Sequence, residues 1–194
     1  MKAPAWWRRR SAALALAGAA CVACVPARAG FWLDGERRIT LHARDGSQLE
    51  IGRVHFHRGA DGRSSFRLAL DAARFTDHFL SMREFKCLPG QGEILCHVPY
   101  PHRSPAVAAP GDLAWLEHSL LFMFKRPNEF GAQLWNGIYF KLAHTDEGLD
   151  GVPQAVDLNL ISAPPARADV APFRPALRDD LPPNARWFTR LTIR

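Results

Sequence analysis

The residue types best suited to chemistry lie close together in the stretch FKCLPGQGEILCHVPYPHR, residues 85–103. It contains Cys87 and Cys96, the two cysteines outside the first thirty residues, together with His97 and His102. Thiolate and imidazole groups are ligands that zinc prefers, so a zinc site is one interpretation. The Cys-x8-Cys spacing is not that of a redox Cys-x-x-Cys motif. In an oxidising compartment, an even pair of cysteines forms a disulfide instead. The compartment therefore decides between these interpretations.

The N-terminal residues predict export from the cell. A cationic MKAPAWWRRR precedes the apolar SAALALAGAACVACV, and residues 27–29 have the small-x-small pattern of a cleavage site. These are the three parts of a secretory signal peptide, with cleavage after Ala29. The apolar run is shorter than the roughly 20 residues of a membrane-spanning helix. A lipid anchor at Cys21 or Cys24 is disfavoured, because neither follows a Leu-like residue three positions earlier. We expect a periplasmic or secreted protein with no transmembrane segment in the mature chain.

Export favours a structural disulfide between Cys87 and Cys96. If Gln91 and Gly92 form a two-residue turn, the cysteines lie opposite each other at a non-hydrogen-bonded pair, with Cα atoms about 4.5 Å apart. A disulfide accepts that separation. The same register turns the nitrogen of Pro89 away from its partner strand, which a sheet edge tolerates. Closing a loop of about ten residues should stabilise the fold by roughly 2.7 kcal/mol.

Removal of the leader nearly neutralises the chain. The whole sequence has 25 Lys and Arg against 19 Asp and Glu, a net charge of +6. Residues 1–29 hold five of those bases and no acid, so the mature chain has 20 bases against 19 acids and a net charge of +1. Nucleic-acid binding needs a basic stripe on the folded domain, and no clustered stripe remains. We therefore exclude nucleic acid as a partner.

Alternating apolar residues predict antiparallel hairpins in the first half of the mature chain. The pattern runs through residues 39–43, turns at residues 45–47, and resumes at Leu49 and Ile51. Gly52 then shifts the alternation by one residue, which predicts a β-bulge. After a second turn at residues 59–62, the alternation continues over residues 66–70. Strands of this kind have one buried and one solvent-exposed face.

Two helices are predicted, over residues 71–82 and 112–125. The second has an N-cap residue at Asp112, ends before Pro127, and is apolar around much of its circumference. Strands are expected over residues 138–143 and 156–161. The Pro/Ala-rich residues 163–183 should run extended over the surface, because proline cannot donate a backbone hydrogen bond. Alternation in the final RWFTRLTIR predicts a last strand that returns to the sheet.

These elements predict an α+β fold, in which an antiparallel, strongly curved sheet or half-open β-barrel packs on one apolar helix. A complete up-and-down barrel with the helix outside is the alternative. The predicted organisation is a signal peptide at 1–29, a single globular domain at 30–162, and an extended segment at 163–194 that ends in the returning strand.

Two further pairs of polar residues could bind or react. His55 and His57 share a strand face and could begin a zinc or copper site, although an arginine opposite them at residue 67 disfavours a cation. We therefore favour a solvent-exposed role and keep the metal site as the alternative. Glu117 and His118 lie on the apolar helix, where neighbours point about 100° apart. They cannot act on one atom, and we interpret them as the polar strip of the helix.

Aromatic residues suggest a binding role for the loops. Trp135 and Tyr139 belong to the stretch LWNGIYF, and Tyr100 lies between His97 and His102 in the sequence. Such side chains can line a pocket for an apolar or sugar ligand. The nucleophile elbow, the His-Glu-x-x-His motif and the phosphate-binding glycine loop are absent from the sequence.

We therefore predict an exported bacterial envelope protein with no evident catalytic machinery and no cofactor. It would bind a small molecule or another envelope protein through the loop residues His97, Tyr100, His102, Trp135 and Tyr139. A metal-binding protein or metal-dependent enzyme that uses His55 and His57 is the alternative.

Overall fold

A computed structural model describes residues 33–80 and 83–194 of the chain. The predicted signal peptide, its cleavage site after Ala29 and the lipidation candidates Cys21 and Cys24 lie outside the described residues. Within them, the strands are β1 (Gly35–Ala43), β2 (Gln48–Arg58), β3 (Ser64–Leu70), β4 (Thr76–Leu80), β5 (Arg83–Pro89), β6 (Ile94–His97), β7 (Val107–Ala108), β8 (Phe122–Lys125), β9 (Gly137–Thr145), β10 (Gly148–Val156), β11 (Asp179–Asp180) and β12 (Phe188–Ile193). The helical elements are α1 (Ala114–His118) and the 3₁₀ turns η1 (Ala72–Arg74), η2 (Leu158–Ile161) and η3 (Pro175–Leu177).

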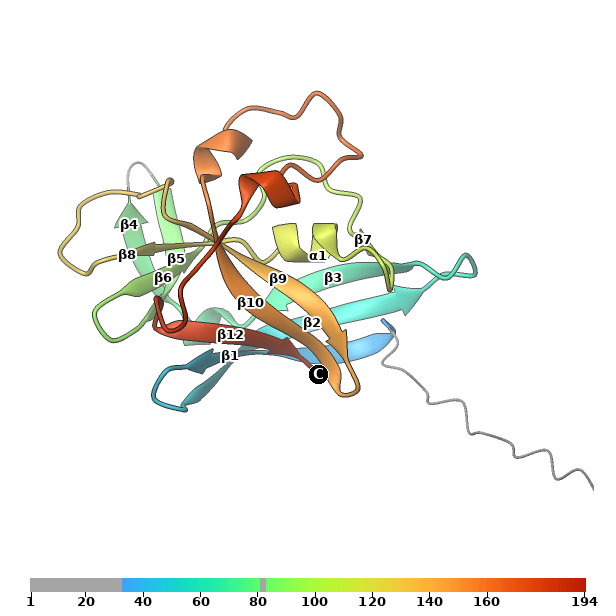
Figure 1. Cartoon of the computed structure of the whole chain (residues 1–194), viewed down its shortest axis with the longest axis horizontal. Coiled ribbons are helices and arrows are strands. Elements are labelled where there is room, and N and C mark those ends of the chain that lie inside the picture. Colours follow the sequence, from blue (N-terminus) through green and yellow to red (C-terminus); the bar gives the residue numbers. More distant parts are fainter. Residues whose placement is uncertain (1–32, 81–82) are drawn as a thin grey trace, which may run out of the picture.

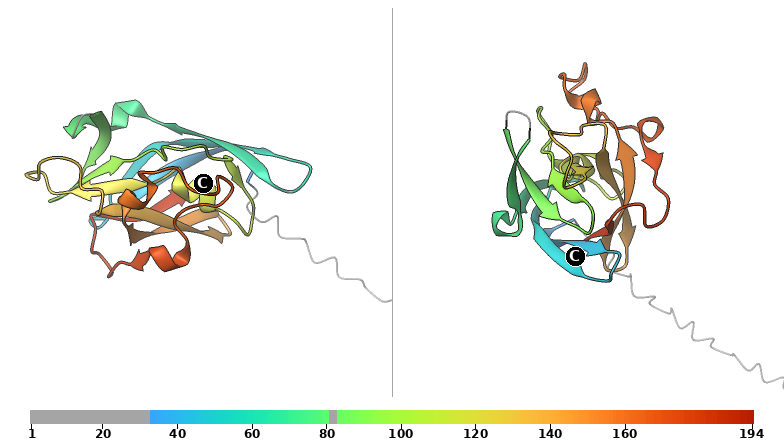
Figure 2. Two further views of the ribbon diagram at one scale, coloured as in Figure 1. Left: turned by 90° about the horizontal axis from the view of Figure 1, so that it is seen from above. Right: turned by 90° about the vertical axis from the view of Figure 1, so that its left-hand side faces the viewer.

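All the strands belong to one antiparallel sheet with the order β4-β5-β6-β8-β9-β10-β12-β1-β2-β3-β7, and β11 adds to β10. The sheet curves strongly, and α1 lies within the curve (Figures 1 and 2). It remains open, with β4 and β7 at its two ends. An open antiparallel sheet with one small helix confirms the coarse form of the prediction. The described chain is nevertheless mostly β, and it does not form the complete barrel of the alternative.

The helix predicted over residues 71–82 is wrong. The Asp71 side chain accepts a hydrogen bond from the Ala73 N–H at 3.1 Å and caps a single 3₁₀ turn. The chain then enters β4, which pairs with β5, and an ion pair joins Asp77 to Lys86 across the two strands. Phe79 had suggested a buried helical face but is 72% exposed. Pairing with a neighbouring strand outweighed a weak local helical pattern.

The long helix predicted over residues 112–125 is also wrong, because only Ala114–His118 is helical. The following residues form β8, which lies between β6 and β9 in the sheet. Phe122 and Met123 on β8 are both fully buried, one on each face. A strand buried on both faces has no polar side, so its sequence resembles that of a buried helix.

The strand predicted over residues 156–161 begins too late along the chain. The partner of β9 is β10, which starts at Gly148 directly after a tight turn. Residues 158–161 form the turn η2 instead, and the Asp157 side chain caps it by accepting from the Asn159 N–H at 2.9 Å.

Both predicted hairpins in the first half have the expected register. Leu41 lies opposite Leu49, and a bulge follows where Ile39 lies opposite Gly52. Gly52 has a φ of 153°, and a Cβ there would come within 2.4 Å of the Ala69 carbonyl oxygen. Only glycine fits this close approach between β2 and β3.

The cysteine hairpin is confirmed. Cys87 lies opposite Cys96, their Cα atoms are 3.9 Å apart, and a disulfide joins them. Pairing between β4 and β5 ends at Cys87, so Pro89 lies beyond the end of β4, where a missing N–H costs nothing.

The last strand, β12, occupies the middle of the sheet. It pairs with β1 on one side and with β10 on the other, and so joins the two parts of the sheet. A register shift beside Ala43 places Phe188 on the same face as Leu191 and Ile193, and all three are buried. The returning strand is therefore present, but a bulge interrupts the simple alternation that the sequence suggested.

The sheet is covered on both faces in its β5-β6-β8-β9 part. The inner face contributes Leu88, Leu95 and Phe122 to the main core. The outer face forms a second core around the disulfide, covered by Leu158, Ile161 and Phe173 from the segment after β10. Among residues 33–80 and 83–194, no helix is long and apolar enough to span a membrane.

Candidate functional site

The histidines beside the disulfide hold backbone groups in place. His97 Nε2 lies 3.1 Å from the Ser119 carbonyl oxygen, and burial lowers the pKa of this histidine. His102 Nε2 lies 2.9 Å from the Ile161 carbonyl oxygen. Both rings therefore bridge this loop to neighbouring segments of the chain.

The aromatic residues singled out in the sequence occupy different environments. Tyr139 is buried in the second core, whereas Trp135 is 63% exposed on the loop between β8 and β9. The ring of Tyr100 packs edge-on against three other rings. Its centre lies 5.6 Å from the ring centre of His102, 5.7 Å from that of Trp115 and 6.0 Å from that of His118. The structure thus brings Tyr100 and His102 into one cluster, and Tyr139 joins it through His118.

His55 and His57 lie on the outer face of β2, opposite Arg67 and Ser65 as predicted. His55 Nδ1 lies 3.3 Å from Glu36 Oε2, and Glu36 also pairs with Arg53. Among the described residues, no group of three or more His, Cys, Asp or Glu side chains could hold a metal ion. The metal site at these two histidines stays a prediction.

Glu117 and His118 do not form the polar strip that we expected, because both are buried. His118 Nδ1 donates to the Ala114 carbonyl oxygen at 2.6 Å, and Nε2 accepts from the Phe173 N–H at 3.0 Å. These two contacts require the neutral ring with its proton on Nδ1. Burial, aided by the charge of Arg178, lowers the pKa of His118 to about 4.

Glu117 accepts a backbone hydrogen bond from β9 beyond the point where β8 stops pairing with that strand. Strand β8 pairs with β9 only at Gly137 and Ile138, and α1 lies beside the rest of that edge. Glu117 Oε1 accepts from the Leu142 N–H at 2.7 Å, and Oε2 accepts from the Tyr139 hydroxyl. Burial raises the pKa of Glu117, against the opposing effect of these hydrogen bonds and of Arg178. The carboxylate therefore replaces a missing strand as the partner of β9.

A cavity of about 350 Å³ opens beside this carboxylate. It lies between the start of α1, the middle of β9 and the residue that follows η3. Its lining residues are Pro110, Gly111, Asp112, Leu113, Ala114, Glu117, Lys141, Leu142, Ala143, His144 and Arg178. The cavity thus has the carboxylates of Asp112 and Glu117 from the α1 segment, and basic side chains from β9 and from Arg178.

One side-chain nitrogen of Arg178, which lines this cavity, lacks a hydrogen-bond partner among the described residues. Its guanidinium carbon lies 4.7 Å from the centre of the Tyr139 ring, in a cation–π contact. Its Nε atom is buried and has no hydrogen-bond partner in the described part of the chain. Arg178 therefore brings a charged hydrogen-bond donor to the wall of the cavity.

Sequence reasoning missed this site. Glu117 lay in a run interpreted as a buried helix, and Arg178 lay in a Pro/Ala-rich segment with no chemical motif. The one local signal was a carboxylate in an otherwise apolar stretch, since charged residues are almost never buried without a partner.

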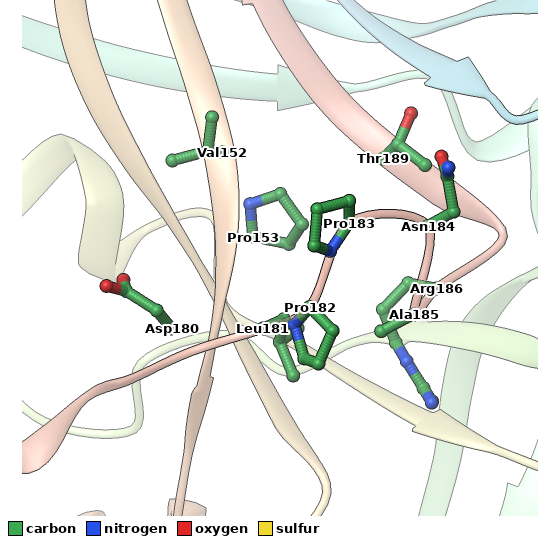
Figure 3. Close-up of a pocket in the computed structure, with 10 residues that line it drawn as sticks. All are labelled: Val152, Pro153, Asp180, Leu181, Pro182, Pro183, Asn184, Ala185, Arg186 and Thr189. Carbon is green, nitrogen blue, oxygen red and sulfur yellow. The ribbon is translucent and has the colours of Figure 1, made fainter.

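A smaller pocket of about 220 Å³ lies where residues 180–186 cross the outer face of β10 and β12. Pro153, Pro182 and Pro183 gather at its centre, and the charged side chains of Asp180 and Arg186 lie toward its sides (Figure 3). Arg186 already pairs with Glu93 and packs over the Phe124 ring at 3.6 Å. This hollow is smaller than the usual small-molecule site, and we interpret it as a packing gap beneath the crossing segment.

Comparisons of this chain with protein-family models, with curated proteins and with solved structures found no match.

Proposed function

We propose that the protein is an exported, non-enzymatic binding protein that holds a small carboxylate-bearing molecule in the cavity beside Glu117 and Arg178. The observation that carries this proposal is the buried Nε of Arg178, which lacks a hydrogen-bond partner among the described residues. An unpaired buried donor costs about 1–3 kcal/mol, which a ligand oxygen would recover. The planar fork of N–H groups on arginine matches a carboxylate in a two-point contact.

The Glu117 carboxylate favours a ligand that also has a hydrogen-bond donor. Each Glu117 oxygen accepts one hydrogen bond from the protein, and a carboxylate oxygen can accept a second. An amino or hydroxyl group on the ligand would provide it. A molecule that carries both a carboxylate and an amino group, such as an α-amino acid, could contact Arg178 and Glu117 together. The cavity volume falls within the range of small-molecule sites.

The arrangement favours binding over catalysis. Both ring nitrogens of His118 are engaged with backbone groups, so this histidine has no free position for a substrate proton. Glu117 and His118 also point to different partners. The disulfide between Cys87 and Cys96 is typical of an oxidising compartment and supports export.

Calorimetric titration with L-alanine, L-glutamate, L-lysine and acetate tests this proposal. We expect at least one amino acid to bind more tightly than acetate. Arg178→Gln should weaken that binding about tenfold or more, a free-energy difference of about 1.4 kcal/mol. Arg174→Gln is the matched control, because Arg174 is exposed on the same segment and does not line the cavity. Its affinity should equal that of the wild type. Failure of all four probes to bind, or equal affinity of the Arg178→Gln variant, would contradict the proposal.

A further inference from the structure

Three arginines form a row across the outer face of three neighbouring strands. The backbones of Arg38 on β1 and Arg194, directly after β12, exchange two hydrogen bonds, of 2.7 and 3.0 Å. On its other side, Arg38 lies opposite Arg53 of β2. Like charges directly opposite each other on adjacent strands destabilise a sheet. A row of this kind therefore needs compensating negative charge.

The negative charge that compensates the three arginines is distributed unevenly among them. Arg53 pairs with Glu36 and Glu50, and Arg194 pairs with Glu147 and Asp150. Arg38, in the middle of the row, makes no ion pair with any residue that the structure describes. Its side chain is exposed, so an anion from outside the protein could reach it.

A groove of about 460 Å³ runs along this face beside Arg38. Its lining residues are Arg38, Thr40, His42, Gln48, Glu147, Arg190, Thr192 and Arg194. Hydrogen-bond donors dominate the lining, and its acidic member, Glu147, lies on the turn between β9 and β10. Asp150 on β10 pairs with Arg190 and Arg194 but does not line the groove.

His42 reports the electrostatic potential inside this groove. Its Nε2 lies 2.9 Å from Thr192 Oγ1. Burial lowers the pKa of His42, and the charges of Arg190 and Arg194 lower it further, against a smaller opposing effect of Asp150. At this ring the charges of the two arginines therefore outweigh that of Asp150.

We infer that this groove binds a phosphate-type oxyanion through Arg38, Arg190 and Arg194. A tetrahedral phosphate presents oxygens in several directions, so arginines from two strands can contact it together, and Gln48 can donate to a further oxygen. A carboxylate presents its acceptor positions in one plane, so it matches donors that converge from several directions less well than a tetrahedral phosphate does. The same phosphate chemistry occurs in free phosphate esters and in phospholipid headgroups. The groove shares no lining residue with the cavity beside Glu117, so this inference does not depend on the proposed function.

The experiment measures binding of pyrophosphate by calorimetry, and binding of vesicles by co-sedimentation. The vesicles are equal mixtures of phosphatidylglycerol and phosphatidylcholine, with pure phosphatidylcholine as the blank. Arg38→Gln should weaken binding about tenfold or more, because it removes a charged hydrogen bond. The matched control is Arg67→Gln, an exposed arginine on the same face of the sheet that lies outside the groove.

Binding in either arm supports the inference, provided that Arg38→Gln weakens it and Arg67→Gln does not. Tighter binding of pyrophosphate would identify a soluble ligand, and binding only to the anionic vesicles would identify a lipid headgroup. A bound anion should also raise the pKa of His42, seen as a shift of its imidazole signals in an NMR titration. Addition of the anion should leave the imidazole signals of His78, on the distant strand β4, unchanged. Absence of binding in both arms, or an equal loss in both variants, would overturn the inference.

Discussion

His118 illustrates how two backbone contacts determine the chemistry of one side chain. A carbonyl oxygen on one side requires a proton on Nδ1, and an N–H on the other requires a lone pair on Nε2. A second proton on the ring would place two donors face to face. The ring also packs between Tyr139 and Phe173, with ring centres 5.2 and 5.4 Å away. The protein therefore keeps this histidine neutral well below the pH at which a free histidine becomes charged.

The first prediction concerns acid. The pKa of His118 is about 4 in the folded protein and near its ordinary value of 6.5 in the unfolded chain. The unfolded state therefore binds the extra proton first as the pH falls. The contribution to stability is complete above about pH 6.5 and is lost as the pH falls toward 4. The total loss should be about 3 kcal/mol. Urea unfolding at a series of pH values measures it.

The control is His118→Gln, which can still accept a hydrogen bond from the Phe173 N–H but does not titrate. Its stability should fall less between about pH 6.5 and 4 than that of the wild type. Glu117 works in the opposite direction, because its raised pKa makes the folded state bind a proton more readily in acid. It is present in both proteins and cancels in the comparison. Equal slopes for the two proteins would contradict the role of His118.

The second prediction concerns Arg38 in the protein without ligand. Arg38→Gln relieves repulsion with Arg53 and Arg194, so it should raise the free energy of unfolding by about 0.2–1 kcal/mol at low salt. The gain should shrink as salt screens the charges. Arg67→Gln should leave stability within about 0.5 kcal/mol of the wild type. Thermal unfolding at two salt concentrations measures these effects. A loss of stability in the Arg38→Gln variant would contradict the prediction, because it would mean that the Arg38 charge has a favourable partner in the wild-type protein.

At the scale of elements, β12 decides whether the sheet is continuous. It links the run β4-β5-β6-β8-β9-β10 to the run β1-β2-β3-β7. Through this link, residues 188–193 pair with residues 39–43, near the other end of the described chain. Strand pairs that join distant parts of a chain pay a loop-closure entropy, which burial must offset. The buried side chains of Phe188, Leu191 and Ile193 provide that burial.

The third prediction follows from this position. Leu191→Ala removes a fully buried side chain and should lower the free energy of unfolding by about 2–5 kcal/mol. Val152→Ala on the neighbouring strand β10 removes a side chain that is 56% exposed, and should change it by less than about 0.5 kcal/mol. Urea unfolding of both variants measures the difference. Similar losses in the two proteins would mean that β12 contributes little to the stability of the sheet.

At the scale of the whole molecule, two regions of the outer face of the sheet differ, because one is covered by another segment of the chain and the other carries a groove. The segment after β10 covers the second core, places Phe173 against His118, and brings Arg178 to the cavity. The outer face around Arg38 and the C-terminal half of β12 instead carries the groove lined by Arg38, Arg190 and Arg194. The two proposed binding regions therefore depend on different parts of the chain.

The fourth prediction concerns export of the whole chain. Expressed with its leader in a bacterium, the protein should be recovered outside the cytoplasm, with Gly30 as its first residue. It should contain no free thiol, because the leader carries Cys21 and Cys24 and the remaining pair forms the disulfide. N-terminal sequencing and thiol titration measure both features. A retained leader, or two reactive thiols in the exported protein, would contradict the prediction.

Local patterns in the sequence predicted the hairpins well. The pairing of Cys87 with Cys96, of Leu41 with Leu49 and the bulge at Gly52 all depend on residues close together in the chain. Turn chemistry and alternation are sufficient there, because a one-residue error would turn every apolar side chain to the wrong face. The sequence by itself therefore determined the register of the early strands and the position of the disulfide.

The tertiary structure alone decided which secondary structure residues 112–125 adopt and where the cavity lies. A segment that is apolar on every side satisfies a buried helix and a central strand equally well, and only its neighbours β6 and β9 select the strand. Glu117 and Arg178 meet at the cavity although they lie far apart in sequence. No local pattern records such a meeting, because it arises from packing between segments that the sheet brings together.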